Sequence, residues 1–130
     1  MDGINLKSTS QSYEILFHSV DSSKQNGSGA SMFKDEMWAT NTSRLGWHQQ
    51  GIWPPCADGS DINSVDRAPN MQVQATADDF GFVKLFKYPS PVEKADCNKY
   101  PGHSSHVTKV RFHHNCNYLM STGGEDKAIF

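Results

Sequence analysis

Apolar and polar residues alternate along several short stretches of the chain. The pattern is clearest over residues 71–76, Met-Gln-Val-Gln-Ala-Thr, and residues 106–112, His-Val-Thr-Lys-Val-Arg-Phe. A period of two predicts strands with one buried face, because successive side chains of a strand point to opposite sides. Composition predicts further strands at residues 13–20, 82–88 and 118–122. No window of about 11 residues has the spacing of an amphipathic helix, so the predicted fold class is all-β.

Residues typical of turns separate the predicted strands. The segment 77–81, Ala-Asp-Asp-Phe-Gly, predicts the turn of an antiparallel hairpin over residues 71–88. Gly-Gly-Glu-Asp at 123–126 predicts the turn of a second hairpin, which begins at Tyr118. Residues 22–31, rich in Ser and Gly, are predicted to form a flexible loop.

The predicted strands recur with a period near 45 residues. When the two hairpins are overlaid, Thr76 falls on Thr122 and Val83 falls on Ile129. A period of this length, with the order strand, turn, strand, acidic turn, strand, is typical of the four-stranded blade of a WD40 β-propeller. The sequence therefore predicts a partial WD40 β-propeller, an incomplete ring of about two to three antiparallel blades.

The repeat suggests how the chain is divided. A flexible N-terminal segment, residues 1–10, precedes a propeller fragment that consists of a partial blade with an insertion at about 11–50, a blade at 51–95 and a last blade at 96–130. The third strand of a WD40 repeat ends on Trp, and counting along the last blade places this Trp at position 132. We therefore expect the chain to be cut within the third strand of the last blade.

Several unrelated short motifs, in a fixed order, resemble the echinoderm microtubule-associated protein-like family. The resemblance covers roughly residues 10–130, and the family fold is a tandem pair of β-propellers that binds tubulin and microtubules. The motifs are Gly-Ile-Trp-Pro at 51–54, Asp-Ile-Asn-Ser-Val at 61–65, Ala-Asp-Asp-Phe-Gly at 77–81, Lys-Leu-Phe-Lys-Tyr-Pro at 84–89 and Gly-His-Ser-Ser-His-Val-Thr at 102–108.

The resemblance implies a non-catalytic protein-interaction module in the cytoplasm, at the microtubule cytoskeleton. Its expected partners are tubulin or microtubules and the remaining blades of the propeller, and no cofactor is implied. The resemblance does not identify which residues contact tubulin. The alternative is a general WD40 scaffold that holds a protein other than tubulin.

The WD40 pattern assigns a structural role to His103, Thr122 and Asp126. In this pattern the three side chains form a buried hydrogen-bond chain, and a buried carboxylate needs such partners because an unpaired one is very costly. The same residue types are those of a hydrolase triad. We favour the structural role, because the repeat register explains all three positions.

The earlier units depart from the WD40 pattern. His18 and Phe86 stand where a repeat usually has Trp, and Cys56-Ala57 replaces the Gly-His that opens a unit. The acid of the middle unit, Asp79, is one residue out of register with Asp126. Only the final blade is therefore expected to carry the full hydrogen-bonding pattern.

Composition narrows the range of functions. The formal net charge is −2, with acids and bases interspersed, whereas nucleic acids and anionic membranes need a basic patch on their partners. We therefore expect neither of them as the main partner, and no apolar run is long enough to span a membrane. The three cysteines are an odd number at wide spacings, which favours a reducing compartment over a disulfide framework.

Two other clusters could carry chemistry. Asp78-Asp79 could serve as a catalytic carboxylate pair, but adjacent residues rarely converge and a turn explains them. A dense group of histidines and a cysteine has the residue types of a zinc site, but neighbouring strand positions point to opposite faces, so no metal site is expected. This group consists of His103, His106, His113, His114 and Cys116. Of the tryptophans, Trp53 is expected to pack an inserted loop onto its blade, whereas Trp38 and Trp47 could mark a binding surface.

Overall fold

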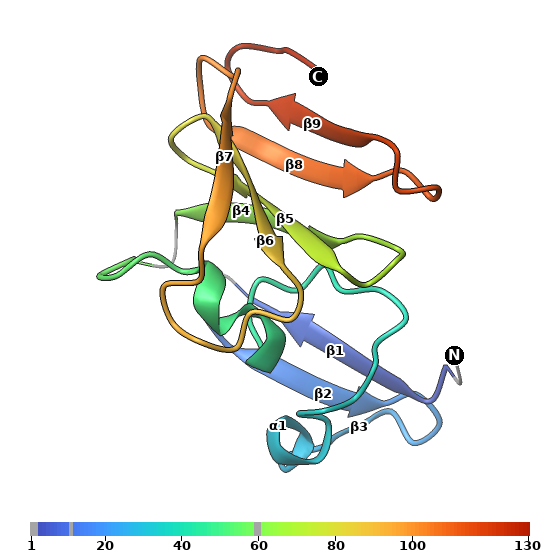
Figure 1. Cartoon of the computed structure of the whole chain (residues 1–130). Helices are drawn as coiled ribbons and strands as arrows, with labels where there is room; N and C mark the ends of the chain where they lie inside the picture. The colour runs from blue at the N-terminus through green and yellow to red at the C-terminus, as the bar shows by residue number, and fades with distance from the viewer. Residues whose placement is uncertain (1–2, 11, 59–60) are drawn as a thin grey trace.

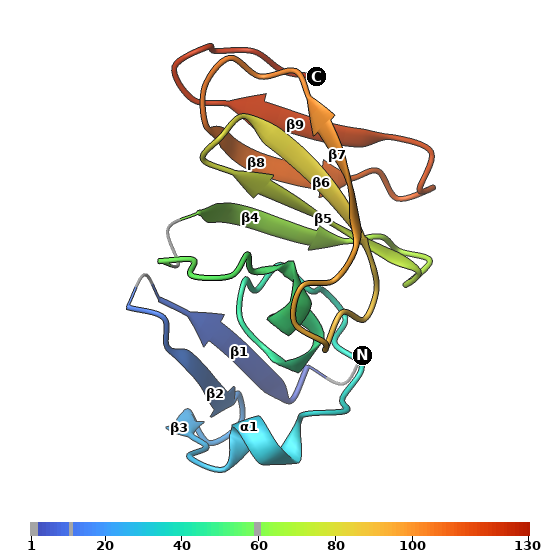
Figure 2. The same cartoon turned by 60° about the vertical axis from the view of Figure 1, so that its left-hand side comes forward.

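The computed structural model describes residues 3–10, 12–58 and 61–130, and these residues form three antiparallel sheets. The sheets lie one above another in chain order, with the N-terminal sheet at one end and the C-terminal sheet at the other (Figure 1). A view turned by 60° shows the same stack (Figure 2). The all-β prediction is confirmed, and the sheets do not close into a ring.

The N-terminal sheet has three strands in the order β1-β2-β3, and the short helix α1 follows it. The expectation of a flexible segment over residues 1–10 is wrong for β1, whose backbone pairs along its whole length with β2. The expected loop at 22–31 likewise contains β3 and α1. The elements are β1 (Asn5–Thr9), β2 (Ile15–Ser19), β3 (Lys24–Gln25) and α1 (Gly29–Met32).

Strand β1 was missed because its sequence, Asn-Leu-Lys-Ser-Thr, carries a single large apolar residue. That residue, Leu6, is 56% exposed, so the strand contributes little apolar surface to the core. Backbone pairing places it instead, with Asn5 opposite Ser19 and Thr9 opposite Ile15. Backbone hydrogen bonds to a neighbouring strand can hold such a strand in place even when its side chains show no strand pattern.

The middle sheet is a four-stranded blade in the order β4-β5-β6-β7. Strands β5 and β6 pair antiparallel, with Ala77 opposite Val83, and the turn between them lies at residues 79–81. The first predicted hairpin is therefore confirmed. The strands are β4 (Ile62–Arg67), β5 (Val73–Asp78), β6 (Phe82–Lys87) and β7 (Cys97–Pro101).

The C-terminal sheet pairs β8 (Val107–Phe112) with β9 (Leu119–Gly123). After β9 the chain turns back, and the backbone groups of Ser121 and Phe130 exchange hydrogen bonds of 2.9 and 3.0 Å. A bridge between Thr122 and Ile129 lies beside them. The second predicted hairpin is therefore confirmed.

An apolar cluster joins the middle and C-terminal sheets. Ala75 and Ala77 of β5 are fully buried against Val107 and Val110 of β8, which are also fully buried. The small alanine side chains leave room for the two valines at van der Waals distance. Phe86, which occupies a usual Trp position, is 4% exposed and belongs to a second cluster with Ile52, Ile62 and Val65.

Polar contacts from β4, the edge strand of the middle sheet, reinforce this packing. The carboxylate of Asp66 accepts the backbone N–H of Phe112 at 2.7 Å and pairs with Arg111 at 3.3 Å. The Asn63 amide donates to the carbonyl of Val107 at 3.0 Å. Side chains of one sheet thus satisfy groups of the next.

A long connection between β3 and β4 contains the 3-10 helix η1 (Trp47–Ile52) and holds the N-terminal sheet to the middle blade. Arg44 donates to the carbonyl of Ile62 at 2.7 Å, and the Trp53 indole donates to the carbonyl of Arg44 at 3.1 Å. Trp53 also packs against the second apolar cluster, as expected for an inserted loop. None of the helices in the described residues has the length and apolar character needed to cross a bilayer.

A valine pair tests the packing between the middle and C-terminal sheets. Val110→Ala should lower the free energy of unfolding by about 2 kcal/mol, because it removes two methyl groups from a fully buried site. Val92→Ala, at a site that is 73% exposed, should cost less than about 0.5 kcal/mol. Urea unfolding followed by tryptophan fluorescence measures both. Equal losses would contradict the assigned core.

Candidate functional site

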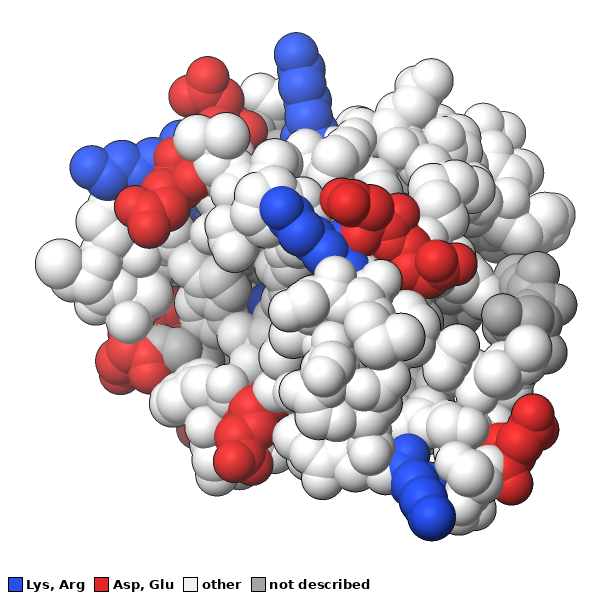
Figure 3. All heavy atoms as spheres, turned by 90° about the horizontal axis from the view of Figure 1, so that it is seen from below, with Lys and Arg blue, Asp and Glu red and all other residues white. Residues whose placement is uncertain are grey.

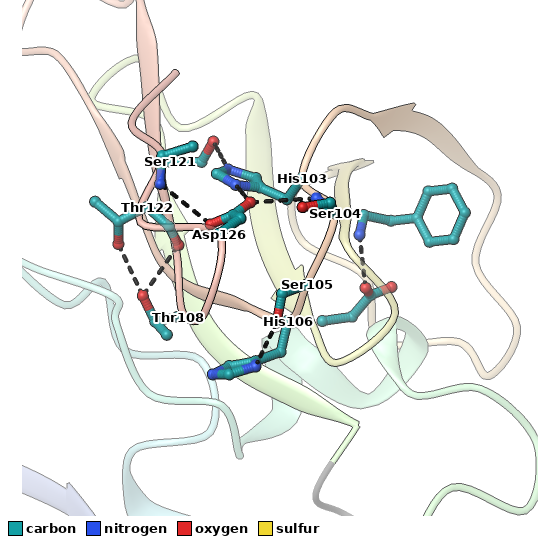
Figure 4. A network of polar contacts seen from close by, with 11 residues as sticks. His103, Ser104, Ser105, His106, Thr108, Ser121, Thr122 and Asp126 are labelled. Atoms are coloured by element: carbon teal, nitrogen blue, oxygen red, sulfur yellow. Dashed lines mark hydrogen bonds and ion pairs between the residues drawn. The ribbon is translucent and has the colours of Figure 1, made fainter.

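A buried polar network connects three segments at the end of the chain. His103 lies in the loop between β7 and β8, Ser121 lies in β9, and Asp126 lies in the turn that follows β9 (Figure 4). The loop can approach because Gly81 has a φ of +82°, and a Cβ there would lie 2.6 Å from the carbonyl oxygen of His103. At Gly123 a Cβ would collide with the carboxylate of Asp126.

The imidazole of His103 is held at both nitrogens. Nδ1 lies 2.8 Å from Oδ2 of Asp126, and Nε2 lies 2.9 Å from Oγ of Ser121. A carboxylate only accepts, so Nδ1 is the donor; in the neutral ring, Nε2 then accepts from the serine hydroxyl. The side chains of His103 and Asp126 are only 2% and 7% exposed.

Further donors hold the carboxylate of Asp126. The backbone N–H groups of Ser104 and Ala128 each donate to it at 3.2 Å. Burial alone would raise the pKa of Asp126, but the hydrogen bonds from Ala128, His103 and Ser104, together with the charge of His103, lower the pKa below its ordinary value. The carboxylate is therefore ionised at neutral pH, and it fixes the loop and the turn together.

The comparison with protein families agrees with this architecture. The whole chain, residues 1–130, matches the family described as the echinoderm microtubule-associated protein second beta-propeller. The chain belongs to this family. The resemblance carried by the short motifs is thereby confirmed, and so is the assignment to a β-propeller.

Individual members of the echinoderm microtubule-associated protein family match over nearly the full chain. The chain is 46% identical over 125 residues to the 77 kDa echinoderm microtubule-associated protein of Lytechinus variegatus. This match covers 96% of the chain and 19% of that relative. The chain is also 46% identical over 129 residues to the echinoderm microtubule-associated protein-like 3 of Mus musculus. This match covers 99% of the chain and 14% of that relative. The chain thus spans less than a fifth of the length of these relatives.

Within this second-propeller fragment, the expected role of Thr122 is wrong. Its hydroxyl lies 2.9 Å from that of Thr108, and His103 contacts Ser121 instead. The reason is the alternation of a strand: Ser121 shares a face with Leu119, which packs against the core, and Thr122 faces the other way. Overlaying the two hairpins by their threonines therefore assigned the wrong hydroxyl to His103. The alternation of the strand would have identified Ser121, because it lies two residues after the core residue Leu119.

The acid of the middle blade is also one residue from its expected position. Asp78, 1% exposed, accepts the N–H groups of Phe80 and Phe82 at 2.9 and 2.8 Å and pairs with Lys84 at 2.7 Å. Asp79, the expected acid, is exposed and accepts from Asn63 at 2.7 Å. The carboxylate of Asp78, at the end of β5, can close the turn. The side chain of Asp79, one residue later, lies on the exposed surface.

The histidines and cysteine that have the residue types of a zinc site do not form one cluster. The His113 and His114 rings lie against each other, with centroids 4.1 Å apart, and His106 contacts the hydroxyl of Ser105 at 3.0 Å. Across the described ranges, no three His, Cys, Asp or Glu side chains are grouped in a way that could hold a metal ion. The three cysteines are free thiols in this structure.

By connectivity, Ser121, His103 and Asp126 match the order of a serine hydrolase triad. A nucleophile must reach a substrate, however, and Ser121 is only 6% exposed. The ring of Phe130 covers His103 edge-on, with a centroid distance of 4.7 Å. The arrangement can therefore fasten a loop to a hairpin. His103, Ser121 and Phe130 also lie in the wall of a cavity of about 510 Å³.

Removing the imidazole tests this fastening role. His103→Ala leaves the Asp126 carboxylate and the Ser121 hydroxyl without their shared partner, and should lower the melting temperature by about 5 °C or more. His114→Ala, at an exposed position, should change it by about 1 °C or less. Differential scanning calorimetry measures both. An unchanged melting temperature for His103→Ala would show that the network does not support the fold.

The pKa of Asp126 predicts how stability depends on pH. Because the folded pKa lies below the unfolded value of about 3.8, the native state binds fewer protons, and stability rises with pH. The contribution is complete above the unfolded pKa and is lost as pH falls through the folded pKa. Asp126→Asn should therefore flatten the acid limb of a stability–pH curve measured by urea unfolding between about pH 2 and pH 6. A limb as steep as that of the unsubstituted chain would contradict this assignment.

Proposed function

We propose that this chain is a non-catalytic part of a protein-interaction propeller that binds tubulin or microtubules. The observation that carries the proposal is the match of the whole chain to relatives named as microtubule-associated, at 44–46% identity. The match extends over 96–99% of the chain and therefore includes all three sheets. The corresponding location is the cytoplasm, at the microtubule cytoskeleton.

The non-catalytic part of the proposal is supported by the surroundings of the polar network. The serine–histidine–aspartate connection joins β9, its following turn and the loop before β8. Its hydroxyl is buried, and Phe130 packs on its imidazole. These contacts support a scaffold role for the network.

The surface charge supports association with protein over association with nucleic acid. On the face seen from below, Lys and Arg side chains lie among Asp and Glu, separated by uncharged surface (Figure 3). The whole chain has 12 basic and 14 acidic side chains. Such a mixed surface supplies local contacts of both signs without a single large electrostatic field.

The expected partners include the remaining blades of the same propeller. The relatives extend well beyond the matched region, since the chain covers only 13–19% of their lengths. A propeller protects its strand edges through neighbouring blades. We therefore expect the microtubule-binding surface to be complete only in the whole propeller.

Co-sedimentation with stabilised microtubules tests the proposal. A full-length protein that contains this region should pellet with microtubules in a saturable manner. Exchanging residues 61–130 for the equivalent blades of an unrelated WD40 propeller should reduce the pelleted fraction several-fold if these blades contribute to binding.

The matched control is His103→Ala in the same full-length protein. Because His103 is a scaffold residue, its pelleted fraction should fall only as far as the folded fraction falls, as measured by circular dichroism. Full binding by a correctly folded exchange variant would overturn a microtubule-contacting role for these blades.

A further inference from the structure

Three polar side chains meet between the N-terminal sheet and the middle blade: Lys7 of β1, Asn41 of the long connection and Arg67 at the end of β4. The ammonium of Lys7 donates to Oδ1 of Asn41 at 2.8 Å. Asn41 is 1% exposed, and its Nδ2 has no hydrogen-bond partner among the described residues. This free donor is on the same amide group that Lys7 contacts.

Arg67 adds a second cation with unused donors. Its side chain is 8% exposed, and Nη2 donates to the carbonyls of Trp38 and Ala39 at 2.7 and 3.2 Å. Within the described part of the chain, Nε and Nη1 have no partner. An arginine keeps its charge when buried, so these donors retain a demand for negative charge.

No carboxylate neutralises this pair of cations. The ion pairs found among residues 3–10, 12–58 and 61–130 involve neither Lys7 nor Arg67. Burial, and then the charge of Arg67, lower the pKa of Lys7 to about 8. The pKa of His48 is lowered by burial and by both cations, and Asp35 acts on it in the opposite direction.

A cavity of about 330 Å³, with both polar and apolar residues in its wall, adjoins Lys7. Trp38 and Ala39, whose carbonyls hold Arg67, form part of its wall, and the Lys7 ammonium lies 4.8 Å from the centre of the Trp38 ring. Hydroxyl groups supply further donors around the same space. They belong to Thr9, Thr40 and Thr42, whereas the hydroxyl of Ser43, also in the wall, donates to the carbonyl of Leu45.

We propose that this cavity binds an oxyanion, the carboxylate or phosphate group of a ligand, which Lys7 and the neighbouring hydroxyl groups hold. Lys7 and the three threonines line one space. Asn41 is bound to the Lys7 ammonium, and Arg67 is bound to the carbonyls of two wall residues, so both flank that space. Charged donors of this kind form their strongest hydrogen bonds with carboxylates and phosphates. A bound anion also relieves the cost of keeping two cations partly desolvated. The site is independent of the proposed microtubule function.

The titration of Lys7 tests the site on the unmodified chain. A bound anion favours the charged ammonium, so it raises the pKa of Lys7. In chain carrying 13C-labelled lysine, NMR should show the Lys7 midpoint near pH 8 in sodium chloride and higher by about one pH unit in sodium phosphate of equal ionic strength. Lys24, an exposed lysine of β3, is the control and should not shift.

Two further arms sharpen the test. Asn41→Asp places a carboxylate beside Lys7, and should raise the Lys7 midpoint in chloride and abolish the effect of phosphate. Sodium acetate in place of phosphate distinguishes the sources: a shift with both anions assigns a general oxyanion site, and a shift with one alone assigns the site to that anion. A Lys7 midpoint that neither anion moves, or that moves no more than that of Lys24, would overturn the proposal.

Discussion

The structure depends on the contact between β5 and β8, where two alanines of the middle blade meet two valines of the next sheet. Both pairs are fully buried, and neither sheet could hide these faces alone. The hydrophobic effect is proportional to the apolar area removed from water, so the stacking of sheets supplies the stability that one thin sheet lacks. The hairpins, the polar network and the loop before β8 are all positioned by this packing.

The sequence predicted those parts of the fold in which side chains decide the structure. The hairpin over residues 71–88 follows from a period of two that ends in an acidic Gly-containing turn, and both features are local. Strand β1 could not be found in this way, because its only large apolar residue is exposed and its place comes from backbone pairing with β2. The pattern of apolar side chains cannot predict a strand that is held by hydrogen bonds between peptide groups.

The polar network could likewise be predicted from the sequence only in part. The pairing of His103 with Asp126 followed from the repeat, whereas the choice between Ser121 and Thr122 depended on which side of β9 faces inward. Both carry a hydroxyl, so residue type could not separate them. The cavity beside Lys7 lay beyond sequence reasoning altogether, because its groups come from β1 and from a long connection about 30 residues later in the chain.

The carboxylate of Asp66 has a consequence for the order of the sheets. It binds a backbone group of the following sheet. When Val65 of β4 is overlaid on Val110 of β8, an offset of 45 residues, Asp66 falls on Arg111. The acid of β4 thus faces a base of β8, and β8 carries no carboxylate at the corresponding position. Repeats that share one shape can stack in a wrong sequence or exchange between molecules. A junction whose two sides differ in charge, as between β4 and β8, works against such misassembly.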